Sequence, residues 1–436
     1  MIGSIFLFYY AKYIANNVLL IPECENSLIA LAPSIFFVSI ASCIRGFFNG
    51  INQIPKTAKS QTIEQILKSV LTIGMVEICS YYYDDTAFLA SIASLTTSIS
   101  IFFSLIYLLK TYRTLRKVYS LKIMEHNKIK NESVFFILKK ILEVSIPITF
   151  TAVLGTLGKN IDSLTVVRIL TPILGDSAAK LRYGILSSKV EMLTVMPLAF
   201  NIAFSTALVP KISADLAVKD FSTINKRIYF SMLVTLIIAF PAAIGLSFFS
   251  QPILNLLFPN ASDGAELLKI SALSVIILAM IQTINGVLSG IGKANVSAIS
   301  LLVGIVVKII LNTILIPNSY FYEKGAIIGS IGSNLVVLMI SWNILAKNIP
   351  LEFRLDQIVM KPFCAAMIMG VSSYEIYLYM FNYGMPEKIA TIFGIVFAIF
   401  IYLILLLLLK VFSKEEILLL PKGEETYRFL KKLKIY

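Results

Sequence analysis

Charged side chains inside apolar segments are the residues of this chain that could do chemistry. Glu64 and Lys68 are one helical turn apart, so their side chains share one face of a helix. Lys308 and Asn312 have the same spacing inside a long apolar run. Placing an ammonium group at the centre of a bilayer costs about 2.5 to 3.5 kcal/mol unless a counter-charge or water meets it. Each segment is therefore predicted to contact an anionic ligand or an internal carboxylate.

A second group of charged residues lies between positions 159 and 191. Internal ion pairs, such as Lys159 with Asp162 or Glu64 with Lys68, are one interpretation of these charges. Cations nevertheless outnumber carboxylates in the apolar segments, which favours a cavity with surplus positive charge and an anionic substrate. The residues predicted to line such a substrate-binding cavity are Lys68, Lys308, Glu64, Asn312, Lys159, Asp162, Arg168 and Glu191.

The sequence contains no pattern typical of a catalytic, cofactor or metal site. Its four cysteines are far apart and form no CxxC motif, and its one histidine, His126, has no neighbouring ligand set. We therefore expect no catalytic residue, no cofactor and no metal site, and the sequence does not specify a coupling ion.

The elements that must position these residues are transmembrane helices. Hydrophobic residues make up 57% of the 436 residues and charged residues 14%, with a mean hydropathy of +0.83. Apolar windows of about 20 residues, the length that crosses a hydrocarbon core, recur along the chain. They predict an all-α integral membrane protein with about twelve transmembrane helices, near 3–21, 28–49, 62–80, 87–109, 138–158, 183–208, 228–250, 265–288, 295–316, 325–346, 360–380 and 388–410.

The distribution of Lys and Arg predicts the orientation of these helices. One set of alternate connections carries 27 of these residues and the other carries five. Because basic residues stay on the cytoplasmic side of short loops, both termini are predicted to be cytoplasmic. The net charge of +13 is then mostly this topological signal, which argues against nucleic-acid binding. We expect a multi-pass protein of a bacterial plasma membrane.

The segments 44–70 and 284–310 form an internal repeat at an offset of 240 residues. Gly46/Gly286, Gly50/Gly290 and Lys68/Lys308 coincide without a gap. Both copies read as helix, short glycine-containing turn and helix, in the same direction across the membrane, as in transporters with parallel repeats. We expect an incomplete N-terminal lobe of four helices (1–110), a basic cytoplasmic loop (111–134), a six-helix lobe (135–350), two additional helices (351–410) and a basic tail (411–436). Two more helices are expected upstream of Met1.

The chain resembles the polysaccharide exporters of the multidrug/oligosaccharidyl-lipid/polysaccharide (MOP) flippase superfamily, in particular the stage V sporulation protein B group, related to lipid II flippases. The resemblance rests on "LAPSIFFVSIASCIRGFFNGINQIPKTAKSQTIEQILK" (31–68), "SIPITFTAVLGTLGKNIDSLTVVRIL" (145–170), "MPLAFNIAFSTALVPKIS" (196–213) and "VVKIILNTILIP" (306–317). It implies a MATE-like fold of fourteen helices, with two six-helix lobes and two extra helices. It also implies export of lipid-linked glycans by alternating access.

We therefore expect a monomeric flippase, not an enzyme, that moves an anionic lipid-linked oligosaccharide or peptidoglycan precursor of the polyprenyl pyrophosphate type. Its role would lie in cell-wall, spore-cortex or polysaccharide biosynthesis. Lys68 and Lys308 would face one another across a central cavity and bind the diphosphate, with Glu64 holding Lys68 between turnovers. The alternatives are a cation-coupled multidrug exporter and an integral-membrane glycosyltransferase. The exporter needs a carboxylate-dominated cavity, and the transferase needs a large extramembrane loop.

Overall fold

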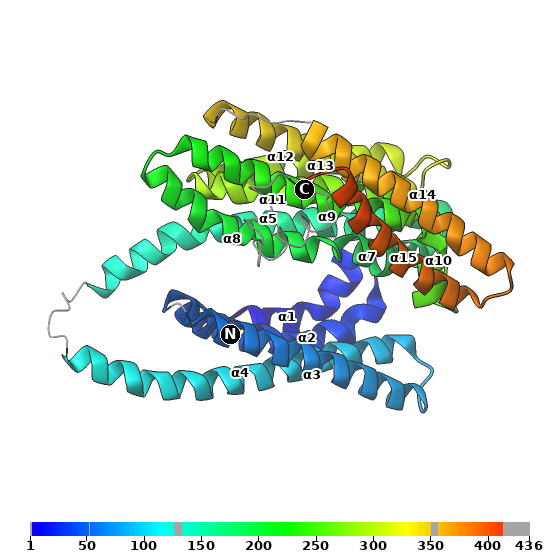
Figure 1. Cartoon of the computed structure of the whole chain (residues 1–436). Helices are drawn as coiled ribbons and strands as arrows, with labels where there is room; N and C mark the ends of the chain where they lie inside the picture. The colour runs from blue at the N-terminus through cyan, green and yellow to red at the C-terminus, as the bar shows by residue number, and fades with distance from the viewer. Residues whose placement is uncertain (1, 52, 126–132, 350–355, 413–436) are drawn as a thin grey trace. The chain divides into compact units, whose positions relative to one another are not determined.

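The computed structural model describes residues 2–51, 53–125, 133–349 and 356–412, and these residues form helices joined by short turns (Figure 1). This confirms the predicted all-α fold. The chain divides into two compact units, Met1–Lys139 and Lys140–Tyr436. Each unit is described by itself below.

The first unit is a small helical bundle in which α2 and α3 both pack against α4. The N-terminal helix continues directly into a π-helical turn. Two residues then connect this turn to a short 3-10 turn, which leads directly into α2. The elements are α1 (Ile2–Tyr13), η1 (Ile14–Leu19), η2 (Pro22–Cys24), α2 (Glu25–Gly50), α3 (Ile54–Ser80) and α4 (Thr86–Glu125).

The second unit is a larger bundle with α9 and α11 at its centre. Ile228, Leu233, Ile284 and Leu288 are fully buried there and form the middle of the main hydrophobic core. The elements are α5 (Val134–Leu174), α6 (Asp176–Gly184), η3 (Ile185–Val190), α7 (Glu191–Val195), α8 (Leu198–Ala217), α9 (Phe221–Phe248), α10 (Ser250–Leu257), α11 (Ala265–Gly290), α12 (Ala294–Leu315), α13 (Glu323–Asn348), η4 (Asp356–Met360), α14 (Lys361–Asn382) and α15 (Glu387–Leu408).

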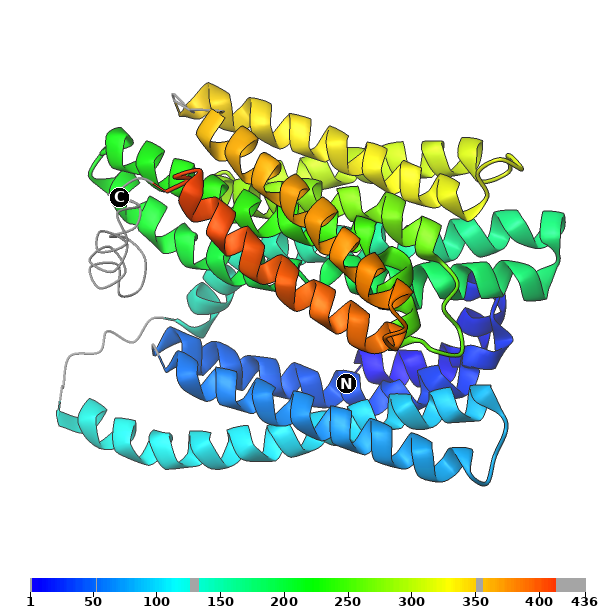
Figure 2. The same ribbon diagram turned by 45° about the vertical axis from the view of Figure 1, so that its right-hand side comes forward.

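The described residues 361–408 contain the last two helices, α14 and α15. They lie side by side in both ribbon views, and α14 also packs against α9 (Figures 1 and 2). Residues 413–436, most of the predicted basic tail, lie outside the described residues.

Eight helices of the described residues are long and apolar enough to cross a membrane, compared with the twelve spans predicted. They cover Pro22–Gly50, Thr86–Leu115, Phe221–Phe248, Ala265–Gly290, Asn295–Leu315, Glu323–Asn348, Asp356–Asn382 and Glu387–Leu408.

The other four predicted spans are not among these eight helices. The segment 3–21 changes from α-helix to π-helix after Tyr13, and 183–208 is divided among α6, η3, α7 and α8. Helix α3 is 27 residues long, but its five charged residues lower its mean hydropathy. Helix α5, which contains 138–158, is 41 residues long, and several of its side chains are not among the described ones.

The predicted basic loop starts later in the chain than expected. Helix α4 continues to Glu125, so residues 111–125 are helical and not loop. Lys and Arg are good helix formers, and a helix need not end where it leaves the hydrocarbon region. Residues 126–132, including His126, lie outside the described residues.

The bounds of the helices agree with the predicted repeat. Helices α2 and α11 are both 26 residues long and begin 240 residues apart, and α3 and α12 begin at the same offset. The turns between them also match: the amide of Gln53 donates to the carbonyl oxygen of Phe48 at 2.7 Å, and that of Lys293 donates to Leu288 at 2.8 Å. In both units the two repeated helices pack on the helix that follows, α4 or α13. The two segments therefore share a backbone architecture.

Candidate functional site

A buried ion pair occupies the interior of the second unit, where α5, α12 and α13 meet. Lys308 Nζ donates a hydrogen bond to Asp162 Oδ2 at 2.8 Å and another to the carbonyl oxygen of Gly158 at 2.9 Å. Ser330 Oγ, from α13, lies 3.4 Å from the same carboxylate oxygen. The side chains of Lys308 and Asp162 are only 8% and 4% exposed. We call Gly158, Asp162, Thr165, Lys308, Asn312 and Ser330 the Asp162 cluster.

Asn312 satisfies the second oxygen of the carboxylate. Its Nδ2 donates to Asp162 Oδ1 at 3.0 Å and to Thr165 Oγ1 at 2.9 Å. This position of the amide depends on Gly329 of α13, because a Cβ atom there would lie 2.2 Å from Asn312 Oδ1. Lys308 and Asn312 thus lie on one face of α12, as their spacing predicts, and both donate hydrogen bonds to the Asp162 carboxylate.

The charged groups of the Asp162 cluster depend on one another. Charges removed from water are strongly unfavourable unless they are paired and hydrogen-bonded, and deleting one member of a buried pair typically costs about 3 to 5 kcal/mol. Here both carboxylate oxygens and the ammonium group have partners. Asp162 pairs with Lys308, and the side chain of Lys159, the partner that the sequence predicts for Asp162, lies outside the described ones.

A second ion pair lies in the first unit between α2, α3 and α4. Arg45 Nη2 donates to Glu64 Oε2 at 2.6 Å and to Ser104 Oγ at 3.1 Å, and Arg45 Nε donates to Ser60 Oγ at 3.1 Å. The side chains of Arg45 and Glu64 are 15% and 16% exposed. The predicted pairing of Glu64 with Lys68 is therefore wrong, because Arg45 on the neighbouring helix takes the carboxylate.

Lys68 lies on an exposed polar face of α3. This face consists of Gln61, Thr62, Gln65, Lys68 and Ser69, all exposed and close together on the helix surface. Among the described residues, Lys68 has no hydrogen bond or ion pair. Lys68 is thus an exposed cation, whereas its repeat partner Lys308 is buried against Asp162.

The two copies of the repeat therefore carry different chemistry on the same backbone. Arg45 and Glu64 correspond to Asn285 and Gly304 in the second copy. Gly304 allows close packing: a Cβ atom there would lie 2.4 Å from Val337 Cγ2, and Ser333 Oγ donates to the Gly304 carbonyl oxygen at 2.7 Å. The second unit therefore has a close contact between α12 and α13 at the position where the first unit has the Arg45–Glu64 ion pair.

Two further predicted residues lie on α5 and α7. Arg168 is exposed further along α5, and Glu191 is the first residue of α7 and is partly exposed. Several of the cations counted toward a positive cavity have carboxylate partners. Lys180 pairs with Asp176 at 2.8 Å, and Arg182 pairs with Glu323 at 2.5 Å. The surplus of positive charge predicted for the cavity is smaller than the composition indicates.

Sequence reasoning missed Arg45 and Ser330. Arg45 lies in an apolar helix, and the signal that could have found it is the carboxylate of Glu64 in the next helix. Ser330 has no signal of its own, because serines are frequent in the α13 segment.

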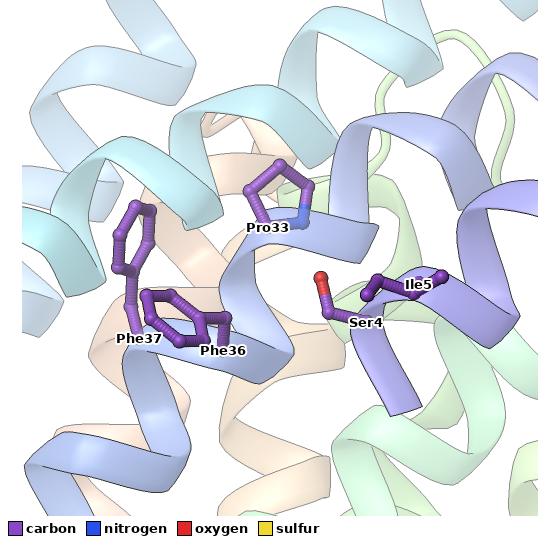
Figure 3. A pocket seen from close by; sticks show the side chains of 5 residues that line it. All are labelled: Ser4, Ile5, Pro33, Phe36 and Phe37. Atoms are coloured by element: carbon purple, nitrogen blue, oxygen red, sulfur yellow. The ribbon is translucent and has the colours of Figure 1, made fainter. Parts of the chain in front are cut away.

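The structure also contains an apolar pocket of about 340 Å³ between α1 and α2, lined by Ser4, Ile5, Pro33, Phe36 and Phe37 (Figure 3). Ser4 Oγ donates to the Ala32 carbonyl oxygen at 2.6 Å. Because none of these five described lining residues is charged, they do not offer a site for an anionic group.

Comparison with known proteins gives a consistent classification. Residues 1–215 match the family described as Polysaccharide biosynthesis protein, and residues 147–314 match the family described as MatE. Stage V sporulation protein B of Bacillus subtilis is 25% identical over 96% of this chain and 79% of its own length. Lipid II flippase MurJ of the same organism is 25% identical over 72% of this chain and 58% of its own length.

Solved structures share the fold. The inward closed conformation of lipid II flippase MurJ aligns with a TM-score of 0.63 and 16% identity, over 92% of this chain and 79% of that one. An inward-facing multidrug resistance MATE family transporter of the MOP superfamily aligns with a TM-score of 0.61 and 14% identity, over 80% and 77%.

The eight long apolar helices and the matched relatives support a multi-pass membrane transporter. The two family matches and the likeness to stage V sporulation protein B and MurJ support an MOP-superfamily flippase related to the lipid II flippases.

Proposed function

We propose that this protein moves an anionic lipid-linked oligosaccharide or peptidoglycan precursor, of the polyprenyl pyrophosphate type, across the bacterial plasma membrane by alternating access. The names of its relatives, a sporulation protein and a lipid II flippase, support a role in cell-wall or spore-cortex synthesis. Both termini would be cytoplasmic, as the distribution of Lys and Arg indicates.

The exposed polar face of α3 is the observation that carries this proposal. A helix of 27 residues is long enough to cross a bilayer, but hydrocarbon cannot solvate the amide, hydroxyl and ammonium groups of this face. The face must therefore border water or a polar ligand. Lys68 supplies a compact charge with three donors, which suits a phosphate group.

Lys68 and Lys308 then have different roles. Lys308 donates to Asp162 within the second unit, so it could bind a diphosphate only if that ion pair opened. Lys68 needs no such rearrangement within the first unit, because Glu64 is held by Arg45. We therefore assign headgroup binding to Lys68.

The test is transport in proteoliposomes that contain a polyprenyl-pyrophosphate-linked sugar, with the Lys68→Gln variant. Losing a hydrogen bond to a charged group costs about 1.5 to 3 kcal/mol, which corresponds to a roughly 10- to 100-fold slower rate. Lys68→Arg keeps the charge and is expected to retain part of the activity.

Lys59→Gln is the matched control. Lys59 is also an exposed lysine of α3, but it lies two turns nearer the helix start, 5.9 Å from the centre of the Tyr107 ring. The Lys59→Gln substitution removes the same charge outside the polar face, so this variant should transport normally. Equal activity of Lys68→Gln and wild type, or an equal loss in Lys59→Gln, would contradict the proposal.

A cation-coupled drug exporter is the alternative that the MatE match keeps in view. Such a mechanism needs a carboxylate that can take a coupling cation. The buried carboxylate of the second unit, Asp162, is already neutralised by Lys308. Proton- or sodium-dependent efflux of cationic dyes, with no movement of the lipid-linked sugar, would favour this alternative.

A further inference from the structure

The oxygen atoms around the Lys308 ammonium group have the arrangement of a cation site. Asp162 Oδ2 and the Gly158 carbonyl oxygen accept its hydrogen bonds at 2.8 and 2.9 Å. Ser330 Oγ lies beside the same carboxylate oxygen at 3.4 Å. A carboxylate oxygen and a carbonyl oxygen of α5 therefore meet the positive charge, and the α13 hydroxyl donates to the same carboxylate.

The charge balance of this group explains why the ammonium is retained. One carboxylate and one ammonium sum to zero in a region where Lys308 and Asp162 are almost completely buried. Removing the ammonium would leave Asp162 with two hydrogen-bond donors, Asn312 and Ser330, but no counter-charge. A buried carboxylate without a counter-charge strongly favours binding of a small cation or loss of its own charge.

We propose that Lys308 is a built-in counter-cation that occupies a monovalent cation site formed by Asp162, Gly158 and Ser330. In the natural chain this carboxylate binds no exchangeable metal ion, because a tethered ammonium is always present at high local concentration. The chain without the ammonium binds Na⁺ there. A monovalent ion restores neutrality, whereas a divalent ion would leave a net positive charge in a region of low dielectric constant.

The tethering also explains the difference between the two copies of the repeat. Lys308 has Asp162 on α5 as its partner, while the exposed Lys68 has no such carboxylate among the described residues. The same lysine position thus serves an internal role in the second unit.

The experiment compares the thermal unfolding of purified full-length wild type, Lys308→Met and the double variant Asp162→Asn/Lys308→Met, in NaCl or in choline chloride at constant ionic strength and pH 8. Only Lys308→Met is expected to show a Tm that rises with Na⁺ and saturates. The rise should reach about 2 °C or more at ten times the Kd. The double variant is the matched control, because it lacks both charges and keeps similar side-chain volumes.

Two results would overturn the proposal. If the wild type shows the same Na⁺-dependent rise, Asp162 already binds an exchangeable ion. If Lys308→Met responds to acid but not to Na⁺, the carboxyl takes a proton and the oxygen atoms do not form a metal-ion site.

The proposal can also be tested if the Lys308→Met variant folds poorly. If Lys308→Met is recovered as a monodisperse protein only when Na⁺ is present throughout purification, the proposal is supported. If it fails in both salts while the double variant folds, the cluster cannot hold Na⁺ and the proposal is wrong. No lipid-linked substrate is used, so failure here leaves the flippase proposal unaffected.

Discussion

Replacing Gly290 by alanine is expected to destabilise the protein, whereas replacing its repeat partner Gly50 is not. Gly290 ends α11 where this helix meets α8. A Cβ atom there would lie 2.9 Å from Ile212 Cβ and 3.2 Å from the Val209 carbonyl oxygen. Ile212 is fully buried, so it cannot move aside. At Gly50, which ends α2, a Cβ atom would have no neighbour within 4 Å among the described residues.

The size of the effect follows from these distances. Carbon atoms in van der Waals contact are about 3.5 to 4.0 Å apart, so the contact at Gly290 is too short by roughly 0.6 Å or more. Overpacking of this kind costs about 1 to 3 kcal/mol. Both variants gain the same helix propensity, about 0.5 to 1 kcal/mol. Because that gain cancels between them, Gly290→Ala should be less stable than Gly50→Ala by about 1 to 3 kcal/mol.

Equilibrium unfolding by SDS in mixed micelles, followed by circular dichroism, measures this difference. The fluorescence of Trp342, the single tryptophan, adds a probe of the second unit because it packs against the main core. The pair Gly286→Ala and Gly46→Ala repeats the comparison one turn earlier, where a Cβ atom at Gly286 would lie 2.3 Å from Ser205 Oγ. Equal stability of Gly290→Ala and Gly50→Ala would refute the close approach of α8 and α11.

Three further predictions follow from the turns and from the ion pair of the first unit. In a cysteine-free background, a cysteine at Asp84 should react with an impermeant thiol reagent in intact cells and one at Ser222 should not; the reverse would overturn the orientation. Asp220 caps α9 by accepting from the Thr223 amide at 3.0 Å, and its bonds with Thr223 hold the pKa of this carboxyl below its usual value. The contribution of Asp220 to stability is therefore present above about pH 4, the usual pKa of the carboxyl, and is lost as the pH falls through the lower folded-state pKa. The Tm difference between wild type and Asp220→Ala should therefore shrink in acid. Glu64→Gln should lower the Tm more than Lys68→Gln, because only the former leaves a partly buried guanidinium without its carboxylate; an equal effect would contradict the assigned pairing.

The class of protein and the positions of most helices could be predicted from the sequence. Transfer of about 20 consecutive apolar residues into hydrocarbon is favourable for that segment alone, so hydropathy locates α9, α11, α12 and α13 without knowledge of their neighbours. The repeat could also be found from spacing, and the helices begin at the predicted offset. The continuation of α4 to Glu125 could not be predicted from the sequence, because basic residues are compatible with either helix or loop.

The partners of the charged residues were decided by tertiary structure. Glu64 has Lys68 one turn away, yet it pairs with Arg45 on another helix; Asp162 pairs with Lys308, which is 146 residues distant. An ion pair forms between the groups that helix packing brings together with the best geometry and least access to water, and sequence spacing does not encode that packing. The equivalent glycines Gly50 and Gly290 differ for the same reason: only one of them meets a neighbouring helix at close range.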